Sequence, residues 1–136
     1  NRISEKTRLR KETITFDGLS GDNDLFVYTS RTDDIPIIRN AELILLYAEA
    51  NIAANPGEAV TALNVIRNSA SLPAYSGAET QAALTAEMLK QRRYELYGEG
   101  HRWIDARRFD ILDTLPIDRP GDDVFVQFPI PLTENQ

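Results

Sequence analysis

The stretch DIPIIRNAELILLYAEANIAANPGEAVTALNVIRNSASLP, residues 34–73, has the pattern of a helix pair. Pro36 fixes an extended approach, Asn40 can cap a helix, and Glu42 suits the positive first turn of that helix. We expect the helix to run to about Asn55. We also expect it to be buried between other helices, because it is apolar nearly all round, with Leu43, Ile44, Leu45, Leu46, Tyr47, Ala48, Ala50 and Ile52.

A second helix is predicted directly after the first. The letters NPG at residues 55–57 break the first helix, and Pro56 suits the first turn of the next one. Apolar residues then recur at helical spacing, namely Ala59, Ala62, Leu63, Ile66 and Ala70. The stretch therefore predicts two antiparallel helices.

A third helix is predicted from LTAEML, residues 84–89. Thr85 is a good N-cap, Glu87 would lie in the positive first turn, and Leu84 can pack on Leu89 across the cap. The expected core stripe is Leu89, Leu96 and Tyr97. The helix should end near Gly98 or Gly100, with a short helix at 102–109 after it. The apolar VFVQFPIPL, residues 124–132, is expected to be an extended strand that leads into a rigid proline segment.

The organisation expected from these patterns is mainly α, with tetratricopeptide-like antiparallel helix pairs (an α-α superhelix), short extended segments and long loops. Residues 1–35 read as a loop or extended arm, in which TITFDGL and DLFVYTSR are separated by the turn cluster SGDND at 20–24. Residues 36–136 read as the helical domain. Only two helix pairs are predicted, fewer than the roughly three repeats such a stack needs, so we expect a fragment of a larger protein.

Composition excludes several classes of protein. The net charge is −6, which offers no basic surface for nucleic acid. No run of eighteen apolar residues could span a bilayer, and there is no cysteine for a disulfide, a thiol nucleophile or a metal site. A zinc site would need more ligands than the single His101, and no G-x-S-x-G elbow supports a serine hydrolase. We predict no metal, no cofactor and no catalytic residue.

The segment QRRYELYGEGHRWIDARR, residues 91–108, has two interpretations. Glu95, Glu99 and Asp105 near a tryptophan could form the paired carboxylates of a glycoside hydrolase. Alternatively, these acids neutralise Arg92, Arg93, Arg102, Arg107 and Arg108 in a partly buried ion-pair network. Trp103 could likewise be a sugar platform or a core anchor. We favour the structural interpretation for the acids and for Trp103.

Four ordered segments resemble the carboxyl-terminal region of the SusD/RagB family: IPIIRNAELILLYAEANI, ALNVIRNSASLP, RRYELYGEGHRWIDARRF and FPIPLTENQ. The resemblance covers about residues 24–136. Its most specific part is similar to the family signature E-L-x-x-E-G-x-R-x-x-D-x-R-R, which falls here on Glu95, Leu96, Glu99, Gly100, Arg102, Asp105, Arg107 and Arg108.

The resemblance implies a tetratricopeptide-like lipoprotein at the outer membrane of Bacteroidetes-type cells, surface-exposed and active in polysaccharide utilisation. Such a protein binds glycans or other nutrients without cleaving them and delivers them to a TonB-dependent, SusC-like transporter. Two features depart from the family: this chain has no amino-terminal lipidation cysteine, so membrane contact would need an anchor outside it, and it lacks the long preceding region. A glycoside hydrolase using Glu95 and Glu99, or a protein-interaction scaffold, remains an alternative.

The ligand itself is not specified by the sequence. Loops positioned by a helical frame usually provide specificity, and two are available, YTSRTDD at 28–34 and PIDRPGDD at 116–123. Tyr28 and Arg31 are the predicted ligand contacts. A structural role is predicted for the signature residues together with the tryptophan, namely Glu95, Glu99, Gly100, Arg102, Trp103, Asp105, Arg107 and Arg108.

Overall fold

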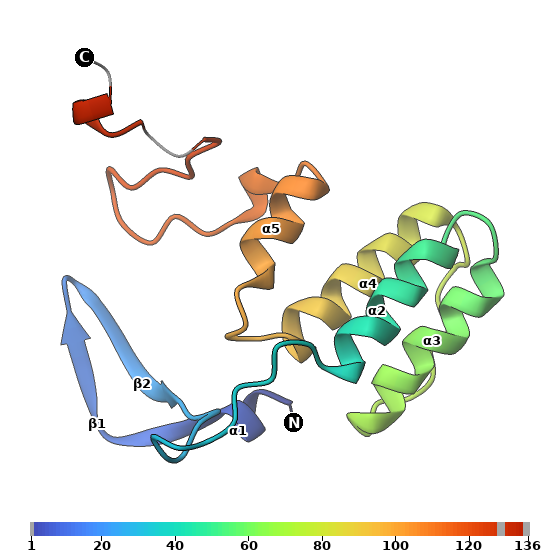
Figure 1. Ribbon diagram of the computed structural model, residues 1–136, viewed down its shortest axis with the longest axis horizontal. Helices are drawn as coiled ribbons and strands as arrows, with labels where there is room; N and C mark the ends of the chain where they lie inside the picture. Colours follow the sequence, from blue (N-terminus) through green and yellow to red (C-terminus); the bar gives the residue numbers. More distant parts are fainter. Residues whose placement is uncertain (1, 128–129, 135–136) are drawn as a thin grey trace. The chain divides into compact units, whose positions relative to one another are not determined.

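The computed structural model describes residues 2–127 and 130–134. The chain forms two compact units, Asn1–Arg102 and Trp103–Gln136. Helices dominate the described residues, and the one sheet found there has two strands (Figure 1). The mainly α, tetratricopeptide-like fold is therefore confirmed. The expected division of the chain at residue 35 stays a prediction.

The first unit begins with a short helix and a hairpin: α1 (Arg2–Lys6), β1 (Thr7–Phe16) and β2 (Leu19–Leu25), the two strands antiparallel. The hairpin turn is Asp17–Gly18, and both residues have positive φ, 50° and 79°. The sequence predicts the turn at residues 20–24, but these residues lie inside β2, so that prediction is wrong. An Asp-Gly pair suits a two-residue turn because such turns need positive φ at both positions, and their twist matches that of the strands.

Three helices of the first unit pack against one another: α2 (Asn40–Asn51), α3 (Pro56–Ser69) and α4 (Gln81–Glu95) (Figure 1). The predicted α2–α3 pair is confirmed, with Pro56 in the first turn of α3. Alanines at the contacts let the helix backbones approach closely. The core they enclose contains Leu45, Ala48, Ile52, Ala59, Ala62, Leu63, Ile66, Leu84, Met88 and Leu96.

Helix α2 differs from expectation at both ends and in its burial. Asn40 is the first helical residue, the cap position belongs to Arg39 without a side-chain cap bond, and the helix ends before Asn55. Its apolar surface is only partly covered, since Leu43 is 50% exposed and Tyr47 52% exposed. Both side chains lie beside α3, where they line an open groove with Thr61, Ala62 and Val65, so α3 covers them only in part.

Helix α4 begins earlier than the sequence analysis predicts. Its N-cap is Thr80, whose Oγ1 accepts a hydrogen bond from the backbone N–H of Ala83 at 3.3 Å. Thr85 therefore lies inside the helix and caps nothing. The buried stripe shifts to Leu84, Met88 and Leu96, while Tyr97, expected in the core, is 44% exposed. The residues that directly follow Thr80 have high helix propensity, so α4 begins there and not at Thr85.

A polar cluster joins α3 to α4. The guanidinium of Arg67 donates to the Glu87 carboxylate and to the carbonyl oxygen of Pro73, the latter at 2.9 Å. The fully buried Gln91 donates to the same carboxylate at 2.6 Å. A buried charge is tolerated only with such partners, so this cluster compensates the burial of Glu87.

The second unit contains most of α5 (His101–Arg108) and two 3-10 helices, η1 (Leu112–Thr114) and η2 (Leu132–Glu134). The short helix expected at 102–109 is thus present. The strand expected at 124–132 is not formed over residues 124–127, and Phe128 and Pro129 lie outside the described residues. Arg107 contacts this segment by donating a hydrogen bond to the carbonyl oxygen of Val126 at 2.6 Å. No helix in the described ranges is long and apolar enough to cross a membrane.

The two competing caps of α4 are distinguished by matched substitutions. Thr80→Ala should lower the free energy of unfolding by about 1 kcal/mol, because it removes an N-cap acceptor. Thr85→Ala should change it by less than about 0.5 kcal/mol, because Thr85 lies within the helix. Urea unfolding of the two variants in the full-length protein measures both values. A larger loss for Thr85→Ala would place the cap where the sequence pattern suggests.

Candidate functional site

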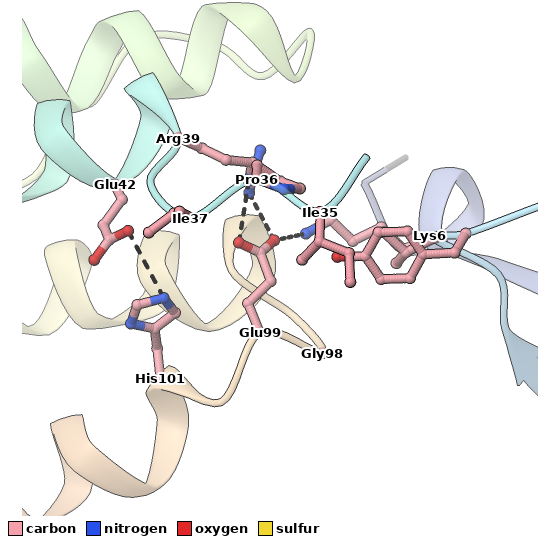
Figure 2. A pocket seen from close by; sticks show the side chains of 11 residues that line it. Lys6, Ile35, Pro36, Ile37, Arg39, Glu42, Gly98, Glu99 and His101 are labelled. Carbon is pink, nitrogen blue, oxygen red and sulfur yellow. Dashed lines mark hydrogen bonds and ion pairs between the residues drawn. The ribbon is translucent and has the colours of Figure 1, made fainter. Parts of the chain in front are cut away.

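A pocket of about 280 Å³ lies in the first unit, where the chain entering α2 meets the loop that follows α4 (Figure 2). Its walls come from segments far apart in the sequence: the end of α1, the loop before α2, the first turn of α2, and residues 98–101. The lining residues are Lys6, Val27, Tyr28, Ile35, Pro36, Ile37, Arg39, Glu42, Gly98, Glu99 and His101.

The Glu99 carboxylate is the centre of the polar wall (Figure 2). Its Oε1 accepts from the Lys6 ammonium at 2.7 Å and from Arg39 Nη2 at 2.8 Å, and its Oε2 accepts from Arg39 Nε at 3.0 Å. The Arg39 contact is the two-bond arrangement that a planar guanidinium makes with a carboxylate. Both oxygens of Glu99 are therefore engaged.

The same two cations also bind the C-terminal end of α4. Lys6 Nζ donates to the carbonyl oxygen of Glu95 at 2.6 Å and to that of Tyr97 at 3.3 Å. Arg39 Nη2 donates to the Glu95 carbonyl at 2.7 Å. The last carbonyls of a helix have no partner within the helix, and they form the negative end of its dipole. Lys6 and Arg39 thus satisfy hydrogen-bond acceptors and charge together.

The charges of this cluster shift two pKa values. Burial alone would raise the pKa of Glu99, but the hydrogen bonds from Arg39 and Lys6, with their positive charges, outweigh it and hold that pKa below its usual value. Burial alone would lower the pKa of Arg39, because it disfavours the charged form, but its contacts with Glu99 and Glu95 raise that pKa instead. The ionised form of each partner stabilises the other.

Backbone geometry brings these parts together. Gly98 has a φ of +80°, and a Cβ at this position would lie 3.0 Å from a methyl group of Leu25 at the end of β2. Glycine therefore permits both the left-handed turn and the close approach of the hairpin. At the base of the hairpin, the N–H of Phe26 donates to the carbonyl oxygen of Lys6 at 2.7 Å, which fixes the backbone that carries the Lys6 ammonium.

Tyr28, one of the two predicted ligand contacts, lines the pocket and is 45% exposed. Arg31 is exposed in the loop beyond it and lies outside the lining residues. The Asp33 carboxylate shapes this loop by accepting from the backbone N–H groups of Thr29 at 2.6 Å and Ser30 at 2.8 Å. These two bonds also lower the pKa of Asp33. The loop therefore has a defined turn immediately after Tyr28.

The partners of Glu95 and Glu99 differ from those expected. Arg39 contacts both acids, and Arg2 lies 3.6 Å from the Glu95 carboxylate. The sequence pattern favours arginines of the same segment as partners, and neither Lys6 nor Arg39 is expected from it. One signal was available for Arg39: it is the only charged residue between Asp34 and Glu42, and a guanidinium in so apolar a stretch needs a carboxylate partner. Nothing local marks Lys6.

The remaining signature residues lie around α5. Gly100 has a φ of +81° in the turn before the helix. Asp105 is 3% exposed, with Arg108 Nη1 at 3.6 Å from its Oδ1, and Arg107 bonds to the segment near residue 126. Arg102 and Trp103 are half-buried. Their structural role stays a prediction. In the described part of the chain, no group of three or more acidic or histidine side chains could hold a metal ion.

Glu99 should make stability depend on pH. A carboxyl with a lowered folded-state pKa contributes stability above its unfolded value, near 4.5, and loses it as the pH falls through the folded pKa. The melting temperature of the full-length protein should therefore fall more steeply, as the pH drops below about 4.5, than the melting temperature of Glu99→Gln. Glu79→Gln, which removes an exposed carboxyl outside the cluster, should follow the unsubstituted protein. Parallel curves for all three proteins would refute the linkage.

Asp105 offers a test of the predicted structural role of the signature. Asp105→Ala removes a buried carboxylate and its contact with the part-exposed Arg108, so it should lower the free energy of unfolding by about 1.5–3 kcal/mol. Asp113→Ala, at an exposed acid of the same unit, should change it by less than about 0.5 kcal/mol. Denaturant titration measures both. An equally small effect at Asp105 would argue against a structural role.

Comparison with known proteins places the chain in a family. The sequence profile of the SusD family matches residues 15–127. A relative from Formosa agariphila, SusD-like protein P38, is 38% identical over an alignment that covers 56% of this chain and 17% of the relative. The chain thus spans about a sixth of the length of that relative. No solved structure matched the chain. Because the family profile covers most of its residues, the chain belongs to the SusD family.

Proposed function

We propose that this chain is part of a non-catalytic binding protein that captures glycans or other nutrients at the outer membrane. In this proposal the protein is a surface-exposed lipoprotein and passes its ligand to a TonB-dependent, SusC-like transporter. Membership of the SusD family supports the general role. The anchor, the transporter and the ligand class are inferences, since the chain spans only a small part of its relative.

The pocket beside Tyr28 is the observation that carries the proposal. Its volume, about 280 Å³, is near the lower end of the range for small-molecule sites. Such sites combine apolar walls with a few polar groups that orient the ligand. Here Tyr28 and the Ile35–Ile37 segment provide the apolar surface, and Glu42 and His101 provide polar groups. This combination suits a sugar, which has both C–H faces and hydroxyl groups.

The state of Glu99 supports binding without hydrolysis. A glycoside hydrolase needs a carboxylic acid whose pKa is raised, so that it can protonate the leaving oxygen. The pKa of Glu99 is instead lowered by its contacts with Arg39 and Lys6, and both carboxylate oxygens already accept hydrogen bonds. Glu99 is thus held as a structural anion, which is the opposite of a general acid.

The ligand-binding role of the Tyr28 loop is testable with a glycan array and the full-length protein. Tyr28→Ala should weaken binding to any glycan recognised by about tenfold, because an aromatic contact surface is lost. Arg31→Ala should have a smaller effect, because Arg31 lies outside the pocket. Tyr47→Ala, at an exposed tyrosine on α2, is the control and should bind normally.

Two results would contradict the proposal. Unchanged affinity in Tyr28→Ala would remove this loop from the ligand site. Release of shorter sugars from a bound oligosaccharide, lost in both Glu95→Gln and Glu99→Gln, would establish hydrolysis in place of simple binding. Chromatography of products after prolonged incubation detects such release.

A further inference from the structure

Two polar side chains in the pocket face each other without touching. His101 Nε2 lies 3.9 Å from Glu42 Oε2, which is too long for a hydrogen bond (Figure 2). Both are accessible from the pocket, with 25% and 22% of their side-chain surface exposed. Within the described residues, neither side chain makes a hydrogen bond. The pocket therefore contains a donor and an acceptor that are both available to a ligand.

The other charged groups of the pocket are already compensated. Lys6 and Arg39 are held by Glu99 and by the carbonyls at the end of α4. The lining charges cancel when His101 is neutral, since Lys6 and Arg39 are positive and Glu42 and Glu99 are negative. Glu42 is the one lining carboxylate whose neighbouring base, His101, is a cation only when protonated. While His101 is neutral, a negatively charged ligand would be repelled by Glu42 and would find no free positive group in the lining.

The 3.9 Å gap suits one bridging hydroxyl group. An oxygen placed roughly 2.8 Å from both atoms would donate its proton to Glu42 and accept one from His101, in the tautomer with the proton on Nε2. A polar pair at such a separation is commonly joined by an intervening oxygen. The geometry points to a ligand that has hydroxyl groups and no need of a charge partner.

We propose that this pocket is a subsite for one uncharged sugar unit, with a hydroxyl bridging Glu42 and His101 and the C–H face of the ring against Tyr28. This assignment rests on the proposed glycan-binding function and adds the ligand class and the two polar contacts. The ring of Tyr28 and the exposed Ile37 give the subsite its apolar wall. Neutral oligosaccharides fit this arrangement better than uronic or sulfated sugars.

The first experiment compares ligand classes by calorimetric titration of the full-length protein at pH 7.5. The neutral probes are xylotetraose, cellotetraose and maltotetraose, and the acidic probe is trigalacturonate. At least one neutral probe should bind about tenfold more tightly than trigalacturonate. Tighter binding of trigalacturonate would overturn the neutral-sugar assignment and leave glycan binding intact.

The second experiment tests the two contacts with the best neutral probe. Glu42→Ala and His101→Ala should each weaken binding by about tenfold or more, because each removes one bond to the same hydroxyl. The double variant should be little weaker than either single variant, since the bridge is already broken. Glu42→Gln, which keeps an acceptor oxygen, should restore part of the affinity, and Glu79→Ala is the control outside the pocket.

The outcomes separate this inference from the proposed function. Affinity for the neutral probe that stays within about twofold in Glu42→Ala and His101→Ala would overturn the subsite, while the glycan-binding function would stand. Additive losses in the double variant would overturn the shared bridge. If no probe binds and the glycan array is also empty, both the function and the subsite are rejected. Thermal melts of each variant identify a loss that comes from unfolding.

Discussion

The contact of the Glu99 carboxylate with Arg39 and Lys6 is the interaction on which the first unit depends. Glu99 lies 60 positions from Arg39 and 93 from Lys6, so one anion joins the start of the chain, the entry to α2 and the exit of α4. Without the Glu99 anion, keeping the two cations partly away from water would cost desolvation free energy. They also bind carbonyl groups at the end of α4, so the cluster serves as the cap of that helix.

The pocket follows from this cluster. By fixing Arg39 and Glu99, the ion pairs set the distance between the first turn of α2, which carries Glu42, and the start of α5, which carries His101 (Figure 2). The charged groups of the pocket thus divide into two kinds. Those that hold the fold are fully engaged with each other, whereas Glu42 and His101 face each other at 3.9 Å and make no hydrogen bond with each other. A substitution in the first group would alter the pocket only through its shape.

The helical part of the unit shows how little apolar surface a three-helix arrangement can cover. Alanines at the contacts of α2 and α3 let these helices pack closely, and leucines from all three helices close the core. Helix α2 nevertheless has apolar side chains on more than one face, and Leu43 and Tyr47 stay exposed. Its composition exceeds what α3 and α4 can bury, which is why apolar periodicity alone overstated its burial.

The helical class, the α2–α3 pair with Pro56 at its turn, the glycine bend after α4 and family membership can all be predicted from the sequence, because they depend on local propensity or on short ordered motifs. Tyr28, predicted from its loop as a ligand contact, lines the pocket, and its contact with a ligand stays a prediction. Local patterns do not specify contacts between distant segments. Which cations contact Glu99, and that Glu42 faces His101, can therefore be read only from the folded structure. Thr80 and Thr85 are both residue types that cap helices, and the helix-forming residues between them place the start of α4 at the earlier one. Ion pairs and pockets form between distant segments, so their partners are settled only when the chain folds.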